Sequence, residues 1–300
     1  MKKLIRVLVI TLLLSCLWGM TVSAAAPTDE SIIALGADLT PEQRTTVLNL
    51  MGVSEEDLPN YRVITITNAD EHQYLDAYMD SSVIGTRALS SVMVTPAEPG
   101  HGVVVTTQNI NYCTTGMYRN ALLTAGVEDA DILVVGPTEL SGTAALIGAI
   151  KAYEEVSGED ISDTTLDAAM NELIATGEIA EKSASSEEVE ELIAYIKAKL
   201  AAGELETEED IRKAIVEAEA KFGVSLTEEE IQQIIDLMMK IKELGLDPNT
   251  LLDQAADLYD KFGDELFEKV QDAGFWQSVG DFFSGIGNAI VNFFKGLFGG

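Results

Sequence analysis

The spacing of apolar residues changes about halfway along this 300-residue chain. Up to residue 156, short β-branched runs alternate with helix-like periods of three to four residues, which predicts strands mixed with helices. From Asp163 onward only the helical spacing remains. A chain of this length, 47% of it apolar, is expected to form two domains with a sizeable core. We therefore predict an α+β protein, with an α/β domain over residues 28–156 and an acidic all-α domain over residues 163–272.

Four segments of the first region are rich in β-branched residues and bounded by turn formers, which is typical of strands. They are residues 61–67, 87–95, 102–107 and 132–135. A breaker-rich stretch at residues 96–101 predicts a turn between the second and third strands, and Gly136 with Pro137 is expected to end the fourth. With helices after the first and third strands, the order matches a ferredoxin-like split β-α-β unit.

Helix ends are marked by capping residues along the whole chain. Thr40 and Pro41 are expected to open one helix, and Asn68 with Glu71 is expected to form a capping box for another. The second region contains three more such boxes, which begin at Ser185, Thr207 and Thr227, and five predicted helices, at residues 165–174, 187–200, 208–222, 228–244 and 248–270.

The N-terminus has the three parts of an export signal. Residues 1–6 carry three basic side chains, and a mainly apolar run follows over residues 7–18. That run is too short for a bilayer span, which takes about 20 residues, and the small residues up to Ala24 suit a cleavage site. We predict a signal peptide over residues 1–24 and an exported, extracellular protein. Cys16 lies in a lipoprotein-like box, so lipidation there stays open as an alternative to simple cleavage.

The charge of the chain excludes one large class of partners. It has 19 basic and 50 acidic residues, for a formal net charge of −31. Binding of nucleic acid requires a basic patch, and the sequence has none, so no nucleic-acid partner is expected. Cys113 is the one cysteine beyond the predicted signal, so no internal disulfide is expected. A lone cysteine of this kind is expected to be buried as a small apolar residue.

The last residues, 275–300, form an amphipathic tail. Seven apolar residues recur there at steps of three and four, which places them on one stripe of a helix: Trp276, Val279, Phe283, Ile286, Ile290, Phe293 and Leu297. A membrane surface is the contact that this pattern favours. Packing against the chain's own helical domain, or against a partner or second copy in a coiled coil, remains the alternative.

The sequence contains none of the common catalytic or metal-binding motifs. It has no His-Glu-x-x-His, Cys-x-x-Cys, Gly-x-Ser-x-Gly, Ser-x-x-Lys or calcium-loop pattern. His72 and His101 are the chain's two histidines, and His101 is expected to be a solvated turn residue. We therefore predict no catalytic residue, no metal ligand and no cofactor.

One loop has the composition of a small-ligand site. Residues 136–143 join a predicted strand to a helix, and Ser141, Gly142 and Thr143 open that helix. Free main-chain N–H groups and two hydroxyl groups at a helix N-terminus can hold an anion. The alternative is a capped helix in which the glycine permits close packing, because the loop lacks the lysine of a nucleotide-binding loop.

Several short segments in combination resemble a known family. They are Ala34-Leu35-Gly36, Val83-Ile84-Gly85-Thr86-Arg87, Asn109-Ile110-Asn111 ahead of Met117-Tyr118, Ala125-Gly126-Val127 and Ser141-Gly142-Thr143-Ala144-Ala145-Leu146. The set resembles the YpuA-like family of secreted Firmicute proteins, over roughly residues 34–155. The resemblance implies an exported protein of a Gram-positive bacterium with a domain of unknown function, and it supplies no catalytic residue.

These observations favour a non-catalytic binding or surface-associated module of the cell envelope. Two alternatives remain at this stage. An envelope hydrolase would use two of the many acidic residues, whose separation in space a sequence does not reveal. A small-ligand or anion binder would use the loop at residues 136–143.

Overall fold

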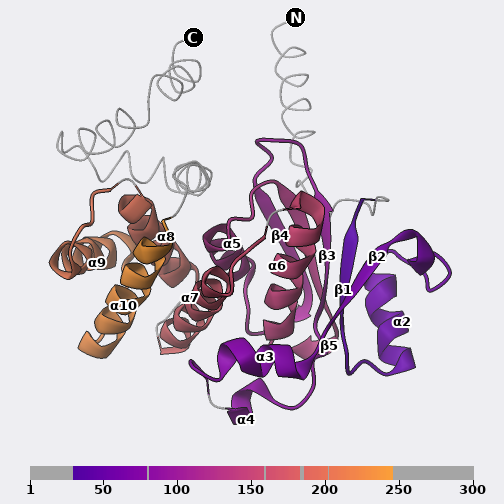
Figure 1. Ribbon diagram of the computed structural model, residues 1–300. Helices are drawn as coiled ribbons and strands as arrows, with labels where there is room; N and C mark the ends of the chain where they lie inside the picture. The colour runs from indigo at the N-terminus through magenta and orange to yellow at the C-terminus, as the bar shows by residue number, and fades with distance from the viewer. Residues whose placement is uncertain (1–29, 80, 159, 183–185, 202, 246–300) are drawn as a thin grey trace, which may run out of the picture.

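The computed structural model describes residues 30–79, 81–158, 160–182, 186–201 and 203–245 (Figure 1). A five-stranded mixed sheet carries helices on both faces, and a further group of helices packs beside it. The predicted α+β class is therefore confirmed. The predicted signal peptide with Cys16, the helix expected at residues 248–270 and the tail at 275–300 lie outside the described residues.

The strands of the sheet follow the order β2-β1-β3-β5-β4. Their bounds are Ile32–Gly36 for β1, Arg62–Ile66 for β2, Ser91–Pro96 for β3, Val103–Ile110 for β4 and Ala130–Leu140 for β5. Strands β1 and β2 run parallel, as do β4 and β5. The central strand β3 runs antiparallel to both of its neighbours, β1 and β5.

This order corrects the predicted ferredoxin-like unit. In that unit β3 and β4 would pair as a hairpin, but β5 lies between them and β2 lies at the edge of the sheet. One reason is β1, which was not predicted: it is buried along its whole length and pairs with both β2 and β3. The other is that β4 and β5 are parallel and so need a crossover, which helix α5 provides.

Strand β5 also runs further than predicted, through Gly136 and Pro137 to Leu140. The strand continues because a bulge accommodates these residues: the β4–β5 register shifts between Gln108 and Ile110. Asn109 adopts a positive φ of 59° there, and its side-chain amide donates a 2.9 Å hydrogen bond to the carbonyl of Gly136. A Cβ on Gly136 would lie 2.8 Å from the Asn109 carbonyl oxygen, so the close approach of the two strands requires glycine.

The helices of the first region cover both faces of the sheet. They are α2 (Pro41–Leu50), α3 (Asn68–Leu75), α4 (Ser81–Ile84), α5 (Thr115–Thr124) and α6 (Thr143–Ser157), with the short 3-10 helix η1 (Leu58–Asn60). Helix α2 buries Val47 and Leu48 against one face, whereas α5 and α6 pack on the other. Thr40 caps α2 as predicted.

The cap of α3 differs from the prediction by one residue. Thr67, rather than Asn68, accepts from the N–H of Asp70, and the Asp70 carboxylate accepts from the N–H of Thr67 in return. Both pairs have the spacing of a capping box, so the sequence alone does not distinguish them. The shift leaves the Asn68 and Glu71 side chains for other contacts, and Glu71 is buried beside Thr143 at the start of α6.

The second region is helical throughout its described length, as predicted. Its helices are α7 (Asp163–Lys182), α8 (Ser186–Ala201), α9 (Glu208–Phe222) and α10 (Glu228–Leu244). The capping boxes at Thr207 and Thr227 are confirmed, whereas Ser185 lies outside the described residues. Helix α7 extends beyond the predicted 165–174 at both ends. Its first half joins the core of the sheet, and its second half joins the core of the other helices.

Candidate functional site

Four of the five strands end at the same edge of the sheet. The two parallel pairs, β1 with β2 and β4 with β5, both run antiparallel to β3, so their carboxyl ends lie together. In open α/β sheets, ligands bind at the carboxyl ends of the strands. The loop predicted from the sequence, Ser141 to Thr143, lies at this edge because it follows β5 and opens α6. We call this edge the carboxyl edge.

The carboxyl edge is built around Gly142. This residue has a φ of 98°, which favours glycine, and its carbonyl accepts a 2.6 Å hydrogen bond from the Tyr118 hydroxyl. Ala145 donates its main-chain N–H to the Ser90 hydroxyl at 3.0 Å. The buried hydroxyl of Thr143 donates to a carboxylate oxygen of Glu71 at 2.9 Å. An acidic group of the chain itself therefore lies beside the N-terminus of α6, where a negative charge is favoured.

Glu71 is 3% exposed, which is unusual for a carboxyl group. Its second oxygen accepts from the side-chain amide of Asn68 at 3.2 Å. Burial raises the pKa of Glu71, and the hydrogen bonds from Asn68 and Thr143 partly oppose this rise. The sequence does not indicate Glu71 as a site residue, because its spacing from Asn68 predicts a helix cap instead.

His72 is held in place at the same edge. Its Nδ1 lies 2.7 Å from a carboxylate oxygen of Asp76, and its Nε2 lies 3.2 Å from the carbonyl oxygen of Gly85. Both partners are acceptors, and the hydrogen bond to Asp76 is the main reason that the pKa of His72 is raised. The histidine therefore ties α3 to the segment after α4. The other histidine, His101, lies away from this edge, with its Nε2 3.4 Å from Asp131.

Cys113 is buried, as predicted. Burial raises its pKa to about 12, so the thiol is neutral at physiological pH and is a poor nucleophile. The adjoining Tyr118 is also fully buried. These two side chains fill the space beneath the carboxyl edge rather than face solvent.

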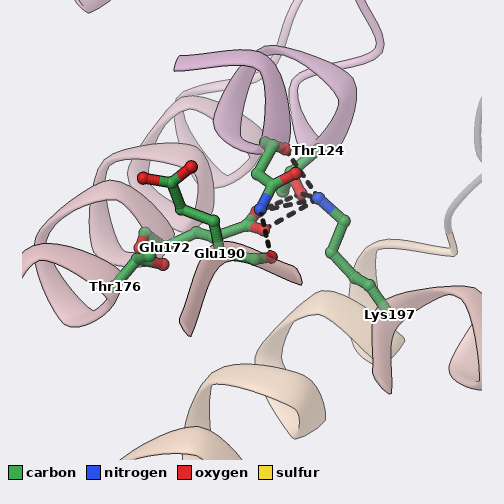
Figure 2. A network of polar contacts seen from close by, with 6 residues as sticks. Thr124, Glu172, Thr176, Glu190 and Lys197 are labelled. Carbon is green, nitrogen blue, oxygen red and sulfur yellow. Dashed lines mark hydrogen bonds and ion pairs between the residues drawn. The ribbon is translucent and has the colours of Figure 1, made fainter. Parts of the chain in front are cut away.

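A second polar cluster lies where the two regions of the chain meet (Figure 2). The ammonium group of Lys197 on α8 lies 2.8 Å and 3.1 Å from the two carboxylate oxygens of Glu172 on α7. It also donates to the Thr124 hydroxyl at 2.8 Å and to the Asn120 carbonyl at 2.6 Å, both on α5. The Thr124 hydroxyl in turn donates to Glu172. Every donor of the ammonium group therefore has an acceptor.

Both charges of this pair are completely buried, with 0% exposure of each side chain. Burial raises the pKa of Glu172 and lowers that of Lys197, and their mutual attraction opposes both shifts. The cluster extends to Glu190 on α8, which accepts from the Asn120 amide through its main-chain carbonyl, at 3.0 Å. Helices α5, α7 and α8 are thereby linked by polar contacts as well as apolar ones.

The sequence prediction also missed this pair, although a signal for it exists. Lys197 falls on the apolar stripe of α8, between Ile193 and Leu200, where a charged residue is out of place. Glu172 falls in the same way on the buried side of α7, between Ala169 and Leu173. A charge on an apolar stripe indicates a buried partner, but the spacing does not say which residue it is.

Metal-binding clusters and membrane-spanning helices are both absent from the described residues. No three His, Cys, Asp or Glu side chains among them lie close enough to hold a metal ion. In the same part of the chain, no helix is both long enough and apolar enough to cross a membrane.

Comparison with known proteins decides the family. The profile of a protein family of unknown function, DUF1002, matches residues 35–258. The chain belongs to this family. Its match covers the carboxyl edge as well as the Glu172–Lys197 pair, and thus both regions of the fold.

One protein of known sequence is similar to this chain over most of its length. The uncharacterized protein YpuA of Bacillus subtilis (strain 168) is 40% identical over 273 residues, which is 91% of this chain and 92% of YpuA. The resemblance inferred from the short segments is confirmed. No solved structure matches the chain.

Proposed function

We propose that this DUF1002 protein is an exported, non-catalytic module of the cell envelope that its C-terminal tail holds at a surface. The observation that carries the proposal is the apolar stripe of the tail, from Trp276 to Leu297, on a chain with a net charge of −31. A large apolar stripe favours contact with a membrane or protein surface. The signal pattern over residues 1–24 supports a location outside the cytoplasm.

The buried ionisable groups support a structural rather than a catalytic use of charge. Glu71 is occupied by Asn68 and Thr143, and Glu172 is occupied by Lys197 and Thr124. Each carboxylate holds neighbouring elements together, and exposures of 3% and 0% leave little of either for a substrate to reach. The hydrolase alternative has no specific observation in its favour among the described residues.

Cell fractionation tests the proposal through a matched pair of tail variants. Phe283→Glu with Ile290→Glu places two charges on the stripe, whereas Ser284→Glu with Asn292→Glu places the same two charges off it. We expect the stripe variant to move from the cell surface to the medium and the control to remain at the surface. Equal distribution of the two variants would contradict attachment through the stripe.

Vesicle flotation distinguishes a lipid surface from a protein surface. The full mature chain is expected to float with neutral phosphatidylcholine vesicles, and less with anionic vesicles, because its net negative charge is repelled. The difference should shrink as NaCl is added, since the screening length falls to about 10 Å at 0.1 M salt. Failure to float with either kind of vesicle would leave a protein as the surface that the tail contacts.

A small-ligand or anion binder at the carboxyl edge is the second candidate. It is favoured by the position of residues 136–143 at the carboxyl ends of four strands. The Thr143 hydroxyl already donates to Glu71, so an incoming anion would compete with that carboxylate. A thermal-shift titration with inorganic phosphate tests this candidate: a saturable rise in Tm that Ser141→Ala weakens supports it, and an unchanged Tm counts against it.

A further inference from the structure

The ring of His72 faces a hydrogen-bond acceptor at each of its two nitrogens. Nδ1 lies 2.7 Å from a carboxylate oxygen of Asp76, and Nε2 lies 3.2 Å from the main-chain carbonyl oxygen of Gly85. A carboxylate and a carbonyl accept hydrogen bonds but cannot donate them. The neutral imidazole has one N–H group, whereas the protonated ring has two. Both contacts are therefore satisfied together only when the ring carries a proton on each nitrogen.

A neutral ring can keep only one of these two contacts, and Asp76 is the stronger partner. Hydrogen bonds to a charged acceptor are shorter and stronger than those to a neutral carbonyl. The hydrogen bond from His72 lowers the pKa of Asp76, which keeps it a carboxylate, and the Ser81 hydroxyl donates to the same oxygen at 3.2 Å. When the ring loses a proton, a lone pair of Nε2 therefore comes to face the carbonyl oxygen of Gly85, and that contact becomes repulsive.

The carbonyl of Gly85 is the point at which residues 85–90 meet α3. It also lies 3.4 Å from the side-chain amide of Asn68, which donates to the buried Glu71 as well. At the other end of the segment, the Ser90 hydroxyl accepts a main-chain N–H from the first turn of α6, at 3.0 Å. Residues 85–90 therefore run along the carboxyl edge from α3 to the start of α6.

Two acidic groups, Asp76 and Glu71, act on His72. They raise its pKa above the ordinary value of 6.5, and the hydrogen bond to Asp76 is the main cause. Helices α4, α6 and α7 pack against α3, and α4 carries no charged residue. The other charged groups around α3 have partners of their own: Lys151 of α6 with Asp70, Asp163 and Asp167 of α7 with Tyr74 and Tyr78, and Asp38 with the main-chain N–H of Ala88.

We propose that His72 is a pH-sensitive switch that closes residues 85–90 over the carboxyl edge when its ring is protonated. The Nε2–H group then holds the carbonyl of Gly85 against α3. When that proton leaves to solvent, which reaches the 30% exposed side chain, the contact with Gly85 opens and the contact with Asp76 remains. The segment then loosens beside the buried Glu71. The inference concerns this edge only and is independent of the proposed attachment through the tail.

The closed form is expected at the lower pH. Because the pKa of His72 is raised in the folded chain, the stabilisation that its proton provides is fully present below about pH 6.5, the ordinary pKa of a histidine. It is lost as the pH rises through the pKa that His72 has in the folded chain. Histidine suits this use, since its charge changes between about pH 5 and 8.

Hydrogen exchange of the full mature chain at about pH 6 and about pH 9, on either side of the titration of a histidine, tests the proposal. We expect protection of the Gly85 and Ala88 amides, corrected for the intrinsic effect of pH, to fall about tenfold when one charge-assisted hydrogen bond is lost. His72→Gln cannot change its charge and should show equal protection at the two pH values. His101→Gln changes the other histidine, which lies 3.4 Å from Asp131, and should behave like the natural chain.

Three results would overturn the proposal. They are a protection that does not change with pH in the natural chain, a change that His72→Gln retains, and a change that His101→Gln abolishes. NMR titration of the histidine rings in the unmodified protein keeps the test valid should His72→Gln not fold. The ring of His72 should lose its second proton over the same pH range in which protection falls, and a ring that titrates without any change in protection would also contradict the switch.

Discussion

The carboxyl edge of the sheet and the junction of α5, α7 and α8 each bury a glutamate, but they compensate it in different ways. Glu71 at the edge receives hydrogen bonds from the neutral groups of Asn68 and Thr143. Glu172 at the junction faces the ammonium group of Lys197, and both are fully enclosed. A carboxyl group with neutral donors can become protonated without leaving a charge behind, whereas neither member of an enclosed pair can be lost alone. Loss of the charge at Glu71 is therefore expected to destabilise the fold less than loss of one charge of the Glu172–Lys197 pair.

The largest expected effect comes from breaking the enclosed pair on one side only. Lys197→Met leaves the Glu172 charge buried without its counter-charge, which typically costs about 3–5 kcal/mol of unfolding free energy. Urea denaturation measures this loss. Adding Glu172→Leu to the same chain should recover most of it, because replacing both charges with apolar groups is often neutral.

A surface pair provides the control for this experiment. Lys213 and Glu209 lie 3.6 Å apart, with exposures of 67% and 69%. Lys213→Met should change the unfolding free energy by less than about 1 kcal/mol, as is usual for exposed ion pairs. Similar losses for Lys197→Met and Lys213→Met would show that the junction does not depend on its buried charges.

A smaller loss is expected at the carboxyl edge. Glu71→Ala removes the acceptor of the buried Thr143 hydroxyl, and an unsatisfied buried donor costs about 1–3 kcal/mol. Glu139→Ala changes an exposed glutamate near the carboxyl edge and should alter the unfolding free energy by less than about 0.5 kcal/mol. A loss for Glu71→Ala as large as that for Lys197→Met would contradict the difference between the two sites.

The smallest effect is a dependence on pH. Because the pKa of Glu71 is raised in the folded state above its ordinary value of 4.5, the folded chain binds more protons than the unfolded chain in the range just above 4.5. The contribution of Glu71 to the unfolding free energy is fully present below pH 4.5 and is lost as the pH rises through the pKa that Glu71 has in the folded chain. Glu71→Gln keeps the shape of the side chain without titrating.

Urea midpoints measured over that pH range check the sign. The stability of the natural chain relative to Glu71→Gln should fall as pH rises, whereas other titrating groups affect both chains alike and cancel. A constant difference between the two chains would mean that the pKa of Glu71 is the same folded and unfolded. A difference that grows with pH would mean that it is lowered on folding.

The helices of the second region were predictable because their signals are local. Thr207 and Thr227 mark their caps three residues before an acid, and the apolar stripes of α9 and α10 follow the helical period. The strand β1 was not predictable in this way. Its five residues are all buried, so the alternation that reveals a half-exposed strand is missing.

The candidate site was only partly predictable. The sequence indicated the loop from Ser141 to Thr143, and the structure places that loop at the carboxyl ends of the strands. Glu71 comes from a different segment, 72 positions away from Thr143. No rule of spacing connects two such residues, because their contact depends on how α3 packs against α6 in the folded chain.

Periodicity, caps and short motifs are properties of neighbouring residues, so the α+β class, the helical second region, the burial of Cys113 and the membership of a family of unknown function were predictable from the sequence. The strand order, the partner of Lys197 and the position of the uncharged strand β4 at a sheet edge became known from the folded chain. Those features depend on which distant segments pair, and that choice is made by burial and hydrogen bonding across the whole fold rather than within any one segment.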